Sequence, residues 1–172
     1  MTFAFKAPAM MPWVIVFLIV VTLLSLALGR RSAANRMIGF VVVAAIVTLM
    51  IARWISISRS TVTVDEAGIV SNVADDPDIP WSEIQGAVYF ASLASSPYVP
   101  MRPQNFLTVI GSLNARFGRF TLPDGRTALV AIQSVSQAAV VITTRDGLYI
   151  FGPTDAAGLA DAMAGRVPVS GR

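Results

Sequence analysis

Two long apolar runs occupy the first third of the chain. Residues 12–28 read PWVIVFLIVVTLLSLAL without a charge, and residues 37–52 read MIGFVVVAAIVTLMIA. As helices, the first is about 25 Å long and the second, continued through residue 57, about 31 Å, close to the hydrocarbon thickness of a bilayer. Both are apolar on every side, unlike an amphipathic surface helix. The pattern predicts transmembrane helices at about 12–28 and 37–55.

The segment between the runs, residues 29–36, contains three arginines and is long enough only for a tight connection. Trp13 and Trp54 are typical of anchors at the headgroup level. A cleaved signal peptide, with Lys6 as its charged end, is the alternative for the first run. The arginines directly after that run argue against it. We expect a two-helix transmembrane hairpin over residues 1–56.

From residue 57 the pattern changes to short alternating strands separated by turn residues, as in a small antiparallel sheet or barrel. Asp65–Gly68 is expected to be a turn in which Gly68 takes positive φ. The Asp-Gly pairs at 124–125 and 146–147 predict two hairpins. Strands are expected at 60–64, 69–73, 87–93, 117–122, 127–132, 139–144 and 148–151.

A short helix is expected after the last strand. Thr154 is the predicted N-cap, and Asp155 favours the first turn through the helix dipole. Leu159 and Met163 are four residues apart and share one face. Gly165 ends the pattern. This helix would close the core of the domain.

These motifs together resemble the bacterial pleckstrin-homology-like (bPH) families, which are often fused to short membrane segments. The resemblance covers about residues 57–166 and implies an α+β chain: a bent barrel of about seven antiparallel strands, with a C-terminal capping helix, after the transmembrane hairpin. Residues 167–172 would be a tail. The resemblance implies no established activity. It rests on IPWSEI at 79–84, GRFTL at 118–122, DGRTALV at 124–130, VVITTRDG at 140–147 and GPTD at 152–155.

Charge is distributed unevenly between the two parts. The whole chain has 13 basic and 10 acidic residues, a net charge of +3. Residues 1–56 contain five of the basic residues and none of the acidic ones, so the rest carries eight against ten, a net charge of −2. A mildly acidic domain does not suit nucleic acid. The basic excess lies at the ends of apolar runs, which indicates membrane topology.

The number of basic residues at the helix ends indicates the side of the membrane, and this number is nearly equal on the two sides. The preference for Arg over Lys indicates a bacterial coding bias. We therefore expect a multi-pass protein of the bacterial cytoplasmic membrane with its domain on the cytoplasmic side. A domain outside the cell is the alternative.

Catalytic chemistry has few candidates in this chain. There is no His and no Cys, which removes the commonest general base and the usual transition-metal ligands. No nucleophile elbow or phosphate-binding glycine loop is present. The acidic run Asp75–Asp78 lacks the glycine and distal Glu of an EF-hand, so a solvated turn is expected there. We predict a protein that is not an enzyme and has no metal or cofactor.

Candidate binding residues lie in two places. Arg116 and Arg119 alternate with phenylalanines, which are expected to point inward while the arginines point outward. The proline-rich loop 94–104 presents apolar residues to a partner or to the bilayer surface. The acidic turn at 65–68 repels phosphate, so no inositol phosphate is expected. The candidate surface residues are Arg116, Arg119, Tyr98, Met101 and Arg102.

The sequence thus predicts a two-pass membrane protein that presents a non-catalytic binding or scaffolding domain. The partners would be the lipid bilayer and another membrane protein or a second copy of the chain. The alternative is a sensor or carrier of a small lipid or peptide ligand. That alternative needs a cavity lined by Phe90, Phe106, Phe117 and Phe120.

Overall fold

The computed structural model describes residues 1–5, 11–28, 33–73, 78–104 and 115–171. The chain divides into two units by its internal contacts. One is the apolar segment Pro8–Ser56, and the other is a domain that combines Met1–Ala7 with Ile57–Arg172. The unit boundary at residue 57 is the one that the change in sequence pattern indicates, but the first seven residues lie with the domain.

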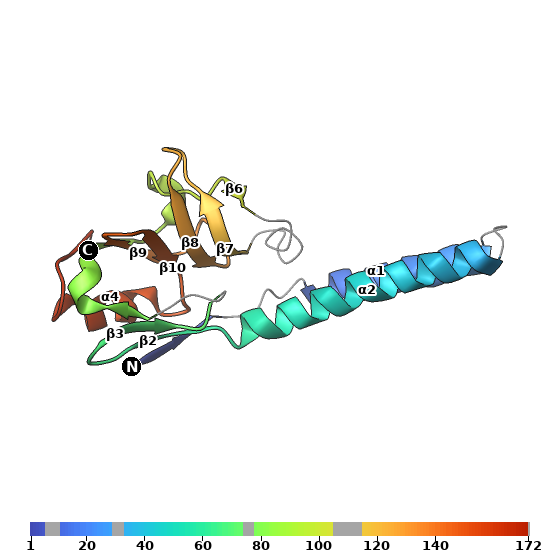
Figure 1. Ribbon diagram of the computed structural model, residues 1–172, viewed down its shortest axis with the longest axis horizontal. Coiled ribbons are helices and arrows are strands. Elements are labelled where there is room, and N and C mark those ends of the chain that lie inside the picture. The colour runs from blue at the N-terminus through green and yellow to red at the C-terminus, as the bar shows by residue number, and fades with distance from the viewer. Residues whose placement is uncertain (6–10, 29–32, 74–77, 105–114, 172) are drawn as a thin grey trace. The chain divides into compact units, whose positions relative to one another are not determined.

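The apolar unit consists of two helices, α1 (Met11–Leu28) and α2 (Ala33–Ser58). Residues of both helices line one groove of about 260 Å³, so they lie side by side, as Figure 1 shows. Two hydroxyls in this groove bond within their own helices. Thr22 donates to the Leu18 carbonyl at 2.7 Å and Thr48 to the Ala44 carbonyl at 2.8 Å. The groove therefore presents little unsatisfied polarity.

The predicted two-helix transmembrane hairpin is wrong. Over the ranges that the structure describes, one helix stretch, Val41–Ser58, is long and apolar enough to cross a membrane. That stretch lies in α2, whose 26 residues extend about 39 Å, longer than the roughly 30 Å hydrocarbon core. The described residues therefore support one candidate span.

The domain contains two separate sheets, and Figure 1 labels strands of both. The smaller has the strand order β1-β2-β3-β4, and the larger has the order β11-β5-β9-β10-β8-β7-β6. The strands of the smaller sheet are β1 (Thr2–Ala4), β2 (Thr61–Val64), β3 (Gly68–Ser71) and β4 (Ile79–Pro80). Those of the larger are β5 (Ile84–Phe90), β6 (Arg102–Pro103), β7 (Arg116–Thr121), β8 (Thr127–Ile132), β9 (Ala139–Thr144), β10 (Leu148–Phe151) and β11 (Val169–Ser170).

The predicted barrel of about seven antiparallel strands is also wrong. Within the described residues no ladder joins the two sheets. Pro80 ends β4, and the short 3₁₀ turn η1 (Trp81–Glu83) leads into β5, which pairs with β9 and β11 instead. Proline has no N–H to continue the ladder. Moreover, β10 is parallel to β8 and β11 is parallel to β5, so pairing is mixed. The fold is mixed α+β with two sheets.

The large sheet is buried on both faces. On β8, Leu129 and Ala131 belong to one core cluster, whereas Val130 and Ile132 belong to a second. Successive side chains of a strand point to opposite faces, so the two clusters lie on opposite faces of the sheet. The first cluster, face 1, includes α4 (Ala156–Ala164) and the small sheet; the second, face 2, includes Leu93 of η2 (Leu93–Ser95). This explains the continuous apolar run of β8.

The two predicted hairpins are confirmed, although Gly147 in the second turn is not among the glycines with positive φ. β7 pairs with β8 and β9 with β10, both antiparallel, and Gly125 has a φ of 84°. Gly68 is not among the glycines with positive φ. A Cβ there would collide with the carbonyl oxygen of Ile79, so glycine is needed for the close approach of β4.

The C-terminal helix forms as expected but begins one residue later. Asp155, not Thr154, is the N-cap of α4, and its carboxylate accepts from the Gly158 N–H at 2.8 Å. The Thr154 N–H donates instead to the carbonyl of Ala4 at 3.0 Å. The predicted tail is not a tail, because β11 adds a parallel strand beside β5, with Val169 opposite Ala87.

Candidate partner surface

The loop that precedes β6 is fixed to the edge of the large sheet. The Met101 N–H donates to the Thr121 carbonyl and the Gln104 N–H to the Arg119 carbonyl, each at 3.0 Å. Between these bonds lies β6, the edge strand beside β7. Met101 remains 59% exposed. The loop therefore presents an apolar side chain from a position that the backbone defines.

Arg116 and Arg119 lie on opposite faces of the large sheet. Arg116 is opposite Ile132, a face 2 residue, and Arg119 is opposite Leu129, a face 1 residue. The phenylalanines differ in the same way, with Phe117 on face 1 and Phe120 on face 2. The alternating sequence therefore does not form one surface of cations and aromatic rings.

Arg116 has a structural role beneath the loop. Its guanidinium donates to the Pro100 carbonyl, and partial burial lowers the pKa of this guanidinium. Arg119, by contrast, is exposed. Arg102 on β6 is opposite Thr121 on β7. Thr121 is two residues after Arg119, so both point to face 1, and Arg102 shares that face. We call Met101, Arg102 and Arg119 the basic edge.

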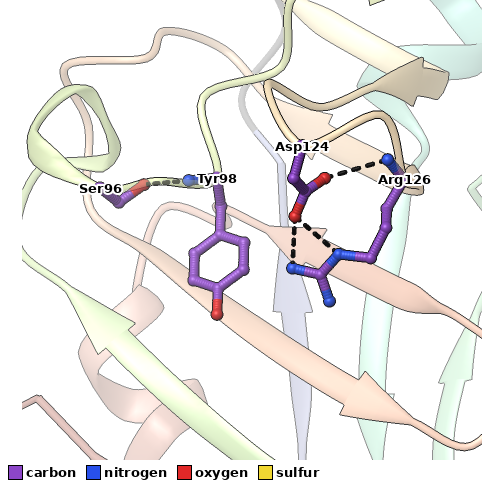
Figure 2. Close-up of polar contacts among 4 residues, drawn as sticks. All are labelled: Ser96, Tyr98, Asp124 and Arg126. Atoms are coloured by element: carbon purple, nitrogen blue, oxygen red, sulfur yellow. Dashed lines mark hydrogen bonds and ion pairs between the residues drawn. The ribbon is translucent and has the colours of Figure 1, made fainter.

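Tyr98 belongs to a small cluster at the other end of the loop, shown in Figure 2. Its N–H donates to the Ser96 hydroxyl at 3.1 Å. Its ring centroid lies 5.9 Å from the Phe90 centroid and 5.9 Å from the guanidinium carbon of Arg126. The ring therefore contacts both a partly buried aromatic ring and an exposed cation, and the contact with the cation is a cation–π arrangement.

Arg126 is held by the carboxylate of Asp124 (Figure 2). The Oδ2 atom accepts from Nε at 2.7 Å and lies 2.6 Å from the second guanidinium nitrogen, and Oδ1 accepts from the Arg126 backbone N–H at 2.9 Å. The side-chain hydrogen bond from Arg126 is the main cause that lowers the pKa of Asp124, and the same bond raises the pKa of Arg126. Both side chains are exposed, so this pair adds little to stability.

The sequence interpretation missed the role of Arg126. It treated residues 123–126 only as a turn. The available signal was the spacing in Asp-Gly-Arg. An aspartate in such a turn accepts a hydrogen bond from the backbone N–H two residues later. The side chain of Arg126 therefore lies beside the carboxylate of Asp124. The contact with Tyr98 joins segments that are far apart in the sequence, and no local pattern indicates it.

Two surface clefts lie elsewhere on the domain. One, of about 340 Å³, lies between the two hairpin turns and is lined in part by Arg126, Thr143, Arg145 and Asp146. The other, of about 380 Å³, is lined by residues of the small sheet and α4, with Asp65, Glu66 and Arg166 among them. Each mixes both signs of charge and does not indicate one class of ligand.

The remaining predicted sites are not assembled by the described residues. Phe117 and Phe120 are 2% and 4% exposed and lie in different clusters, so they do not line one cavity. Phe106 and residues 75–77 lie outside the described residues. Across the described ranges there is no group of three or more His, Cys, Asp or Glu side chains placed to hold a metal ion.

Comparison of the chain with family models, with curated proteins and with solved structures finds no match, so the resemblance to bPH domains stays a prediction and no family is assigned.

Proposed function

We propose that this chain is a membrane-anchored protein of the bacterial cytoplasmic membrane that presents its α+β domain as a non-catalytic binding module. The observation that carries the anchor is the exposure of apolar side chains along α2. Val41, Val42 and Leu49 are 59%, 51% and 50% exposed. Apolar surface costs about 25 cal/mol per Å² in water. A bilayer removes that cost, and the stretch Val41–Ser58 has the length for it.

The remaining apolar helix supports the same environment. Trp13 and Phe17 of α1 are 76% and 65% exposed. A helix with exposed apolar groups on several sides does not suit the surface of a protein in water. We place the domain on the cytoplasmic side of the membrane.

The basic edge is the surface that we assign to a protein partner. Arg102 and Arg119 lie on adjacent strands of one face, at diagonal positions, and diagonal neighbours in a sheet are typically about 7–8 Å apart. Met101 adds an exposed apolar group. Arginine and methionine are enriched in interfaces. A partner with an acidic surface, either another protein or a second copy, fits this combination.

The first test is alkaline carbonate extraction of native membranes. The full chain should stay in the pellet and should be released by detergent. Release by carbonate would contradict the anchor.

The second test is photo-crosslinking from position 101 in native membranes, followed by mass spectrometry. We expect one specific protein adduct, lost when Arg102→Glu and Arg119→Glu are combined. Arg166→Glu, a charge reversal at an exposed residue after α4, is the matched control and should keep the adduct. An adduct that survives the double reversal would contradict the basic edge as the interface.

A further inference from the structure

We propose that the apolar segment Pro8–Ser56 is an insertion within the domain. In this arrangement β1 is a permanent strand of the domain, and residues 1–5 lie in the same compartment as residues 57–171. The position of β1 does not depend on the proposed membrane anchor. The statement about compartments does rest on that anchor.

Strand β1 pairs with β2 along its whole length. Thr2, Phe3 and Ala4 lie opposite Thr63, Val62 and Thr61. The ladder continues at both ends. The Val64 N–H donates to the Met1 carbonyl at 2.7 Å, and the Phe5 N–H donates to the Ser60 carbonyl at 3.2 Å. Residues 1–5 therefore run in register alongside the segment that directly follows α2.

The opposite side of β1 also contacts the domain. The Ala4 carbonyl accepts from the Thr154 N–H at 3.0 Å, just before α4. Phe5 is 3% exposed and belongs to the face 1 cluster. The N-terminal segment therefore fills part of the core and bonds to two distant segments of the chain. Loss of it would leave a cavity in the core and unpaired backbone groups.

Chain connectivity then fixes the topology of the insertion. The segment leaves the domain after β1 and returns to it at β2, and these strands are neighbours in one sheet. Both of its ends therefore lie at the same face of a bilayer, which a lone crossing by Val41–Ser58 does not allow, so the rest of the segment has to bring the chain back to that face. Cleavage after the first apolar run, as in a signal peptide, would remove β1 from its sheet. The mature protein should therefore retain residues 1–5.

The test uses the absence of cysteine from the chain. The hydroxyls of Thr2 and Thr63 lie 3.1 Å apart on directly opposite residues. In the full chain in native membranes, the double variant Thr2→Cys with Thr63→Cys should form an intramolecular disulfide under mild oxidation. Non-reducing electrophoresis and mass spectrometry of the linked peptides would detect it.

Thr2→Cys with Val70→Cys is the matched control. Val70 is opposite Thr63 on the next strand, so it lies two strands from Thr2. Two strand spacings amount to about 9–10 Å, beyond the roughly 7 Å limit between the Cα atoms of a disulfide. Equal crosslinking in both variants, or none in the Thr63 variant, would overturn the inserted strand. A mature chain that lacks residues 1–5 would overturn it as well.

Compartments are tested with single cysteines and a membrane-impermeant maleimide on spheroplasts. Thr2→Cys and Ala157→Cys, both at exposed positions, should be labelled alike, either both before lysis or both only after it. Opposite labelling would overturn the shared compartment. If carbonate releases the chain while the disulfide still forms, the anchor fails and the inserted strand is supported.

Discussion

The ring of Phe5 packs against the ring of Phe117 in an edge-on geometry, with centroids 5.6 Å apart and planes at 76°. Phe5 precedes the apolar helices, and Phe117 lies on β7 of the large sheet. Such a pair adds about 0.5–1.5 kcal/mol beyond its buried area. The contact joins the N-terminal segment to the core that the rest of the domain builds.

The first prediction concerns this contact. Phe5→Ala should lower the free energy of unfolding by about 3–5 kcal/mol, because it removes a buried ring and leaves a cavity. Phe3→Ala is the control, since Phe3 lies on the same strand but is only partly buried, and it should cost clearly less. Urea unfolding of the full chain in detergent, followed by near-UV circular dichroism, measures both. Equal losses would contradict the role of Phe5 in the core.

The position of this strand shows where sequence reasoning reached its limit. The hairpins of β7–β8 and β9–β10 follow from local turn chemistry, and the structure has them. The pairing of Thr2 with Thr63 joins residues separated by the whole apolar segment, and a strand of three residues carries too short a pattern to be recognised. The barrel was wrong because, among the described residues, no ladder joins the two sheets and two strand pairs are parallel.

The sequence predicted only part of the candidate surface, because residue type does not show which face of a strand a side chain lies on. The loop residues Met101 and Arg102 were identified from composition, and they lie at an exposed edge. Arg116 was indistinguishable from Arg119 by residue type. The two arginines are three residues apart, an odd number, so they lie on opposite faces of the sheet. Arg116 is partly buried because the loop that contains Pro100 covers it.

The second prediction concerns Gly68. Gly68→Ala should destabilise the domain, because the added Cβ would collide with the Ile79 carbonyl and separate β3 from β4. The matched control is Gly165→Ala. A Cβ at Gly165 meets nothing within 4 Å, and its φ of −79° suits alanine. The control should be neutral or stabilising by up to about 1 kcal/mol. A tolerated Gly68→Ala would show that β4 is not held this closely.

The third prediction concerns the titration of Asp124. Its pKa lies below the ordinary value of 3.8, chiefly because of the side-chain hydrogen bond from Arg126. A depressed folded pKa stabilises the fold above the ordinary pKa of the carboxyl, and that contribution is lost as pH falls through the depressed value. Arg126→Met should therefore raise the pKa of Asp124 toward 3.8, while the bond from the Arg126 backbone N–H remains.

Carboxyl-carbon NMR titration of the full chain in detergent measures this shift. Arg145→Met removes an exposed arginine from the neighbouring hairpin turn and is the control. It should leave the Asp124 titration where it is. A pKa that moves equally in both variants would indicate a general effect of positive charge instead of the specific bond.

The fourth prediction tests whether α2 is in contact with lipid. Leu49 is 50% exposed near the middle of the stretch Val41–Ser58. An arginine at the centre of a membrane helix costs about 2.5–3.5 kcal/mol on the insertion scale, whereas leucine is favourable. Leu49→Arg should therefore reduce the membrane-inserted fraction in carbonate extraction. Met101→Arg, a matched change at a residue 59% exposed on the domain, should leave extraction unchanged. If both variants stay fully in the pellet, α2 does not face the hydrocarbon at Leu49, and the exposed apolar surface of this helix must contact protein instead.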